Sequence, residues 1–194
     1  TVVVTPVDTE RFLGGAGIVA AHASGLGAQS RILSVVGNDE AAKHVRGFLG
    51  KYQVHGLLQT DVGRPTTLKQ RYRAGGQTLL RVSHLQQGNI SSEIQDQIME
   101  QIRESLDDTD VIIFSDYDKG LIPWSAANYV CQNYKGKIFV DSKKTDLSCY
   151  QNAYIKINEF ENQQALAYSE SCSFIVTLGM NGAKWNGKIY PAPK

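Results

Sequence analysis

Hydrophobic residues along the chain follow two patterns, a repeat at every fourth position and short continuous runs, and each pattern predicts one kind of secondary structure. In the stretch 90–106, Ile94, Ile98, Ile102 and Leu106 recur at every fourth position, which places them on one face of a helix. Short apolar runs predict strands at 31–36, 57–58, 111–114, 137–140, 153–157 and 174–177. Further helices are predicted at 16–27, 39–52, 124–134 and 159–168. Because short strands alternate with helices, the pattern predicts an α/β fold with a mostly parallel sheet.

The stretch 67–83 departs from this alternation and predicts a β-hairpin. Its two halves, LKQRYRA and TLLRVS, flank a glycine pair at 75–76, and paired glycines between two strands favour a tight hairpin turn. Side chains two apart on a strand share a face, so Lys69, Arg71 and Arg73 are expected on one side. Such a row of cations is typical either of a solvated edge strand or of a surface that recognises an anion such as a sugar phosphate.

Four of the predicted parallel strands end in short loop segments, most of them polar. The segments are Ser115-Asp116, Asp141-Ser142-Lys143, the stretch 158–161, and Leu178-Gly179. Open parallel sheets bind ligands beyond the carboxyl ends of their strands, so these groups are expected along one edge. Each loop alone is explained as well by a helix cap or a turn, because Asp, Ser and Asn serve both purposes. The four loops taken together favour a site.

Asn158 and Glu161 stand three residues apart at the predicted start of a helix. This spacing is that of a capping box, in which both side chains bind backbone N–H groups. It also suits a polar pair that reaches the magnesium ion of a bound nucleotide through water, because Mg²⁺ keeps several of its waters in protein sites. The two interpretations are compatible, and both stay open.

Two glycine-containing segments can bring backbone close to a ligand. Gly14 and Gly15 precede a helix of small residues, where the choice is between a ligand-facing helix start and a tight turn. In TLGMNG, residues 177–182, the glycines suit either a turn beside a nucleotide or a plain turn between two strands. The motif GxxxxGK[ST] does not occur in the sequence, which excludes a P-loop.

Composition narrows the class of protein. The chain has 194 residues, of which 42% are hydrophobic and 20% charged, enough for a folded domain with a core. Its net charge of +1 argues against a general nucleic-acid binder. Cys131, Cys149 and Cys172 lack metal-ligand spacing and indicate a reducing compartment. No apolar run approaches the ~20 residues of a membrane span and no signal peptide is visible, so we expect a cytoplasmic protein without a membrane or nucleic-acid partner.

Several stretches together resemble one enzyme family. LGGAGIVAAHASGLGAQSRILSVVGNDE (13–40) is similar to the first signature region of the ribokinase-like (PfkB) carbohydrate kinases, and VTLGMNG (176–182) is similar to their V-T-x-G-x-x-G element. Three further stretches resemble one branch of the family, the D-glycero-D-manno-heptose-7-phosphate kinases. This branch includes the kinase half of bifunctional heptose kinase/adenylyltransferases. The stretches are SDYDKG (115–120), PTTLKQRYRAGGQTLLRV (65–82) and VDSKKTDLSCYQNAYIKINEFE (140–161). The resemblance covers nearly all of the chain, and the order and spacing of the motifs make it specific.

The resemblance implies a three-layer ribokinase-like sandwich with a small β-lid, formed by about 1–13 and 67–83, and a homodimer that pairs through the lid. It implies ATP-dependent phosphorylation of a sugar phosphate, heptose 7-phosphate as the first choice, in the synthesis of lipopolysaccharide-core or nucleotide-sugar precursors. ATP and Mg²⁺ are the implied cofactors. The implied substrate-binding residues are Gly14, Gly15, Lys69, Arg71, Asp116 and Lys119. The implied nucleotide-binding residues are Asn158, Glu159, Phe160, Glu161, Thr177, Gly179 and Gly182, with Asn158 and Glu161 reaching the metal through water.

The sequence also departs from the family pattern. Ile18 stands where the family has an Asn that contacts the substrate, and Ser142 stands where it has a Pro. The family's Asp-Thr-x-Gly-Ala-Gly-Asp segment, which supplies its anion hole and catalytic base, does not follow the stretch 188–190, and the Gly-Asp region that precedes the lid is absent too. A base contributes about 10²–10⁴ in rate, so the 194 residues are expected to be a kinase fragment with little or no activity, and no catalytic residue is assigned. The alternative is a non-catalytic member that binds a sugar phosphate or nucleotide and regulates.

Overall fold

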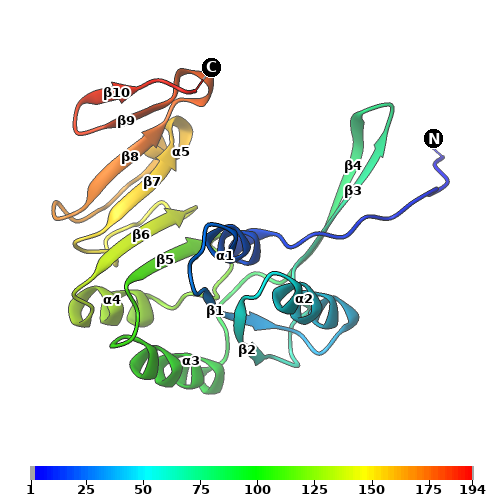
Figure 1. Cartoon of the computed structure of the whole chain (residues 1–194), viewed down its shortest axis with the longest axis horizontal. Helices are drawn as coiled ribbons and strands as arrows, with labels where there is room; N and C mark the ends of the chain where they lie inside the picture. The colour runs from blue at the N-terminus through cyan, green and yellow to red at the C-terminus, as the bar shows by residue number, and fades with distance from the viewer. Residues whose placement is uncertain (1–2, 194) are drawn as a thin grey trace.

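The computed structural model describes residues 3–193, which form two sheets, a separate hairpin and the helices around them (Figure 1). The helices are α1 (Gly15–Gly25), α2 (Glu40–Lys51), α3 (Ser92–Ser105), α4 (Trp124–Asn133) and α5 (Glu159–Gln164), with a 3₁₀ turn η1 (Gly179–Asn181). The strands are β1 (Arg31–Val36), β2 (His55–Thr60), β3 (Leu68–Ala74), β4 (Gln77–His84), β5 (Val111–Asp116), β6 (Lys137–Ser142), β7 (Tyr154–Asn158), β8 (Ser173–Thr177), β9 (Ala183–Trp185) and β10 (Lys188–Tyr190). None of these helices has both the length and the apolar character needed to span a membrane.

The larger sheet has six strands in the order β10-β9-β8-β7-β6-β5. Strands β5 to β8 are parallel, as predicted, and β9 and β10 extend the sheet in antiparallel fashion. Alternate residues of β6 and β7 are buried in one apolar cluster that also contains Val130 of α4; they are Ile138, Val140, Ile155 and Ile157. Burying one such side chain contributes about 1.5–3 kcal/mol, so this core fixes which way each strand faces and where its end points.

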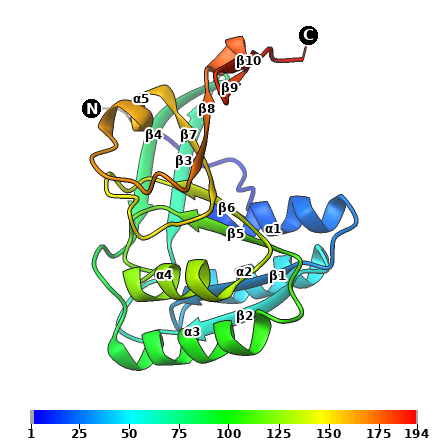
Figure 2. The ribbon, with the colours of Figure 1, turned by 90° about the vertical axis from the view of Figure 1, so that its left-hand side faces the viewer.

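Strands β1 and β2 form a separate parallel sheet and do not extend the larger one. Helix α1 contacts both β1 and β5 and so connects the two sheets. Helix α3, which lies next to α4 in both views (Figures 1 and 2), packs against Val35 of β1 through Ile94 and Ile98. This contact confirms the apolar face predicted for the helix. Arg31 at the start of β1 forms a 2.7 Å salt bridge with Asp108, which precedes β5, so the two sheets are also linked at their amino ends.

Strands β3 and β4 form the predicted antiparallel hairpin, which projects away from the sheets (Figure 1). Gly75 and Gly76 make its turn with φ values of 56° and 79°, a backbone conformation that favours glycine. The pairing register shifts between Tyr72 and Arg73, an irregularity of the kind that increases the local twist. Within residues 3–193, neither outer edge of the hairpin pairs with another strand.

The prediction of an N-terminal strand is wrong for the part of it that the structure describes. Residues 3–13 contain no strand, and residues 1 and 2 of the expected lid strand lie outside the described part. Val3, Val4 and Val7 are exposed in this segment. Their β-propensity does not produce a strand here because that propensity depends on packing against a neighbouring strand.

The helix predicted at 159–168 is too long, since α5 ends at Gln164. The residues that follow leave the helix and turn toward the segment after β6. There the N–H of Leu166 donates to the carbonyl of Thr145 at 2.8 Å. Pairing with a segment distant in the sequence therefore replaces the last predicted turn of the helix.

Candidate functional site

The carboxyl ends of β5, β6, β7 and β8 lie side by side at one edge of the larger sheet. Asp116 at the end of β5 is in register with Ser142 of β6, and Asn158 at the end of β7 is in register with Thr177 of β8. Because the four strands are parallel, the loops that follow them leave from the same edge. The prediction that the four polar strand ends gather in one place is therefore confirmed.

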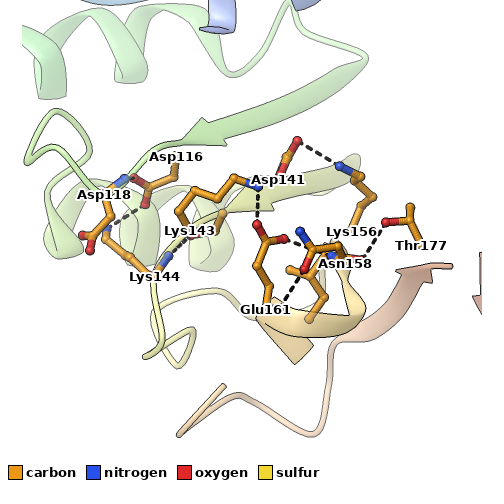
Figure 3. A network of polar contacts seen from close by, with 11 residues as sticks. Asp116, Asp118, Asp141, Lys143, Lys144, Lys156, Asn158, Glu161 and Thr177 are labelled. Atoms are coloured by element: carbon orange, nitrogen blue, oxygen red, sulfur yellow. Dashed lines mark hydrogen bonds and ion pairs between the residues drawn. The ribbon is translucent and has the colours of Figure 1, made fainter. Parts of the chain in front are cut away.

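Lysine and carboxylate side chains alternate along this edge (Figure 3). Lys143, which follows β6, places its Nζ 2.5 Å from Oε1 of Glu161 and 3.4 Å from Oδ1 of Asp141. The Nζ of Lys156 lies 3.2 Å from the other carboxylate oxygen of Asp141. Two cations and two anions thus form one charge-balanced network that joins the ends of β6 and β7.

The pair of Lys143 and Glu161 is held in its ionised form. Partial burial raises the pKa of Glu161, but the hydrogen bonds from Lys143 and from the N–H of Asn158 outweigh burial and bring the pKa below its ordinary value. Burial likewise lowers the pKa of Lys143, while the nearby Glu161 and Asp141 raise it, and the resulting pKa lies above its ordinary value. Both side chains are therefore charged at neutral pH.

Asn158 and Glu161 form the predicted capping box at the start of α5. Oδ1 of Asn158 accepts from the N–H of Glu161 at 2.8 Å, and Oε2 of Glu161 accepts from the N–H of Asn158 at 2.9 Å. Among residues 3–193, no group of three or more His, Cys, Asp or Glu side chains is arranged to hold a metal ion. The donor set therefore does not fit an ion enclosed by protein. It fits a hydrated Mg²⁺, which binds with one or two carboxylates and substrate phosphates.

Asp116 turns inward at the end of β5. Its Oδ2 accepts from the hydroxyl of Tyr150 at 2.7 Å and lies 2.8 Å from Nζ of Lys144, and its Oδ1 accepts from the N–H of Asp118 at 3.0 Å. Burial, and then the charge of Asp116 and its hydrogen bond, raise the pKa of Tyr150, so the phenol stays protonated and donates. Lys144 also donates to the carbonyl of Ile122 at 3.2 Å. This buried cluster of Asp116, Lys144 and Tyr150 ties the 116–122 loop to the segment after β6, and a sugar contact of Asp116 stays a prediction.

Three elements meet around the ring of Tyr117, which follows β5 directly. Gly15 at the start of α1 has φ +53°, and a Cβ built there would lie 3.5 Å from Cε2 of Tyr117. From the hairpin, Nζ of Lys69 lies 5.1 Å from the centre of the same ring, within the range of a cation–π interaction. The structure thus brings together Gly15 and Lys69, two of the predicted substrate residues. The sequence interpretation gave Tyr117 no ligand role, although aromatic side chains are common in the walls of ligand pockets.

Three other predicted substrate residues belong to the same three elements or border them. Gly14 is the N-cap residue of α1 and has an extended backbone. Arg71 stands opposite Arg81 on the hairpin, so the row of cations continues across the two strands. Lys119 is half-buried in the loop after β5. A ligand contact of these residues stays a prediction.

The residues that are predicted to contact a nucleotide in and after β8 are also explained by the local structure. Gly182 has φ +92°, and a Cβ there would come within 1.9 Å of the carbonyl oxygen of Tyr190. Gly179 also has a positive φ, of 59°, and the hydroxyl of Thr177 donates to the carbonyl of Ile157 at 3.3 Å. The turn into β9 therefore requires glycine whether or not a nucleotide is present, and the nucleotide contact stays a prediction.

Glu159 and Phe160 lie in the first turn of α5, and both are exposed. Glu159 lines a shallow cavity of about 450 Å³ between α5, β8, β9 and the turn that follows β9. Val176, Leu178 and Lys184 also line this cavity. Asn162 and Gln163 also line it, so the cavity lies beside the helix that carries Glu161.

Comparison with solved structures defines the class of protein. The fold matches an uncharacterized sugar kinase from Pyrococcus horikoshii with a TM-score of 0.67 at 17% identity, covering 93% of this chain and 69% of that one. Phosphofructokinase-2 from Escherichia coli matches with a TM-score of 0.70 at 16% identity, covering 92% and 66%. Ribokinase from Thermotoga maritima matches with a TM-score of 0.63 at 15% identity, covering 98% and 69%. The fold is that of the ribokinase-like sugar kinases, as the motifs predicted.

Relatives found by sequence make this more specific, although no protein-family model matches the chain. The bifunctional protein HldE of Helicobacter hepaticus is 36% identical over 155 residues, which are 78% of this chain and 32% of that protein. HldE of Paramagnetospirillum magneticum is 31% identical over 148 residues, or 74% and 30%. The chain spans about a third of the length of these relatives. The chain therefore has the fold of the ribokinase-like (PfkB) kinases and is similar in sequence to the bifunctional HldE proteins.

Proposed function

We propose that this chain serves an ATP-dependent sugar kinase whose substrate is a sugar phosphate, with heptose 7-phosphate as the preferred one. The observation that carries the proposal is the gathering of four parallel strand ends at one edge, with the lysine–carboxylate network beside them. The relationship to HldE and the likeness of SDYDKG to the heptose kinases support the choice of sugar.

The nucleotide side of the proposed site is the edge formed by β6, β7 and β8. Phosphoryl transfer depends mainly on positioning the reactants and on neutralising phosphate charge. Lys143 and Lys156 place two ammonium groups at this edge, each paired with a carboxylate in the free chain. Glu161 and Asn158 would hold a hydrated Mg²⁺ through its waters, and the ion would neutralise charge on the transferred group.

The sugar side is the region where α1, the base of the hairpin and the loop after β5 meet. In this proposal the ring of Tyr117 forms one wall, and Lys69 and Arg71 recognise the phosphate of the sugar. Asp116 acts indirectly, because its buried contacts hold the loop that carries Tyr117 and Lys119.

Calorimetric titration of the 194-residue chain tests both sides. We expect Mg-ADP and heptose 7-phosphate to bind, with fructose 6-phosphate at least about tenfold weaker, a difference of about 1.4 kcal/mol. We also expect Lys69→Gln to weaken the sugar phosphate and leave Mg-ADP unchanged. A chain that binds neither ligand contradicts the proposal. Because the family's Gly-Ala-Gly-Asp segment does not occur in the sequence, we expect binding with little or no release of ADP.

A second function, regulatory binding without catalysis, is favoured by Ile18. This residue stands where the family has a substrate-contacting Asn, and it packs against the apolar cluster that includes Leu13 and Ala21. An apolar side chain there cannot donate a hydrogen bond to a sugar. In the complete gene product, binding of both ligands without ADP release would select the regulatory function, and ADP release would reject it.

We also propose a homodimer that pairs through the hairpin of β3 and β4. Neither outer edge of the hairpin is paired within the described residues, and Leu79 and Leu80 are exposed on it. Unpaired strand edges are ready templates for pairing with a second chain. Light scattering at high protein concentration should give twice the monomer mass, and a monomer at every concentration would refute the dimer.

A further inference from the structure

Lys143 occupies the oxygen of Glu161 that the capping box leaves open. Oε2 of Glu161 accepts from the N–H of Asn158 at 2.9 Å, whereas Oε1 accepts from Nζ of Lys143 at 2.5 Å (Figure 3). The side chain of Lys143 is 37% exposed and that of Glu161 is 17% exposed. The lysine is therefore the more solvent-exposed partner of this ion pair.

The second lysine of the network keeps Asp141 neutralised when Lys143 moves. Nζ of Lys156 is 3.2 Å from Oδ2 of Asp141, while Lys143 is 3.4 Å from the other oxygen. If Lys143 leaves, only Glu161 loses its counterion. A different cation can therefore replace Lys143 beside Glu161 while Asp141 keeps Lys156 as its partner.

We propose that Lys143 is an exchangeable counterion of the nucleotide site, an inference that rests on the proposed function. Without a nucleotide, its ammonium group neutralises Glu161. With a magnesium nucleotide present, Glu161 would hold the hydrated ion, and Lys143 would turn its ammonium group to a phosphate oxygen. Every charge has a partner in both arrangements. Partly exposed ion pairs are weak, so the exchange meets little resistance from the pair that it breaks.

Three variants of the full 194-residue chain separate this role from a fixed structural ion pair. Lys143→Gln removes the cation, and Lys143→Arg keeps it. Lys137→Gln is the matched control, because Lys137 begins the same strand at its opposite end. Electron paramagnetic resonance measures the concentration of free Mn²⁺ without nucleotide, and from it the affinity of the chain for the metal ion at Glu161. Calorimetry with a non-hydrolysable magnesium ATP analogue reports on the phosphate contact, and thermal melting followed by circular dichroism checks that each variant is folded.

We expect Lys143→Gln to bind Mn²⁺ about fivefold more tightly than the unmodified chain, equivalent to about 1 kcal/mol, because the competing ammonium is gone. The same variant should bind the ATP analogue about fivefold to tenfold more weakly, because a phosphate contact is lost. Lys143→Arg should restore both values to within about twofold, and Lys137→Gln should change neither.

The two readouts distinguish failure of the exchange from failure of the proposed function. Unchanged Mn²⁺ affinity in Lys143→Gln, or no Mn²⁺ binding by any variant, overturns the exchange. Tighter Mn²⁺ binding with no analogue binding by any variant supports competition between Lys143 and the metal. That result refutes the phosphate contact and the proposed nucleotide site.

Discussion

Lys143 and Lys144 are neighbours in the sequence but belong to two different kinds of charge cluster. Lys143 pairs with Glu161 at the exposed edge of the sheet, and Lys144 pairs with Asp116 in the interior. The carboxylate of Asp116 is 3% exposed and that of Glu161 is 17% exposed. The buried carboxylate also has the hydroxyl of Tyr150, a fixed neutral donor. The surroundings of a lysine–carboxylate pair, and not its residue types or its position in the chain, therefore decide whether the pair is fixed or can change partners.

The physical basis of the difference is desolvation. A pair taken out of water is costly to break, because removing one partner leaves the other charge buried and unpaired. An exposed pair can be replaced by water or by a ligand at little cost. The inner cluster is therefore suited to hold the loop after β5 in place, and the edge network is suited to receive a charged ligand.

The strongest test of this comparison replaces each lysine by a methionine. Lys144→Met should lower the free energy of unfolding by about 3 kcal/mol, because it leaves Asp116 buried beside Tyr150 without its cation. Lys143→Met should lower it by less than about 1 kcal/mol, because its pair is partly exposed. Urea unfolding followed by circular dichroism measures both values. Equal losses for the two variants would show that burial does not separate the clusters.

A smaller effect is expected for Tyr150→Phe, which removes a donor to Asp116. The loss should be about 2 kcal/mol, in the range of hydrogen bonds to charged groups. Because burial and Asp116 raise the pKa of Tyr150, the unfolded chain ionises this phenol above about pH 10 while the folded chain does not. The contribution of Tyr150 is thus present below pH 10 and is lost as the pH rises above it.

Urea midpoints between pH 8 and pH 11 measure this alkaline loss. The unmodified chain should lose stability above pH 10 more steeply than Tyr150→Phe, so the two curves should converge. Tyr52→Phe serves as the control, since Tyr52 is exposed at the end of α2, and it should follow the unmodified chain. Parallel curves for the unmodified chain and Tyr150→Phe would contradict the raised pKa.

Much of the fold could be predicted because local patterns specify it. The isoleucines at every fourth position predict α3, and the pair Gly75 and Gly76 predicts the hairpin. Both predictions succeed because they depend only on residues close together in the sequence. The errors arose where distant partners decide. Residues 3–13 have no strand to pair with, and α5 stops early because Leu166 bonds to Thr145. The division into two sheets likewise depends on contacts that no short stretch encodes.

The candidate site shows the same limit. The order of strand ends was enough to predict that Asp116, Asp141 and Asn158 share one edge. The different burial of Lys143 and Lys144 could not be predicted, because the stretch SKK (142–144) does not indicate which lysine faces the core. Their partners are set by tertiary packing of residues far along the chain.

The smallest expected effect concerns the edge network in acid. Interactions with Lys143 and Asn158 hold the pKa of Glu161 below its ordinary value of 4.5 in spite of partial burial. Glu161 therefore adds stability above about pH 4.5, and the addition disappears as the pH falls through its folded pKa. Glu161→Gln keeps a capping-box residue at this position and removes the charge. It should be less stable than the unmodified chain by under about 1 kcal/mol at pH 7, and the gap should narrow as the pH falls toward 3. Urea midpoints at the two pH values measure the difference, and a gap as wide at pH 3 as at pH 7 would mean that Glu161 acts through packing and not through its charge.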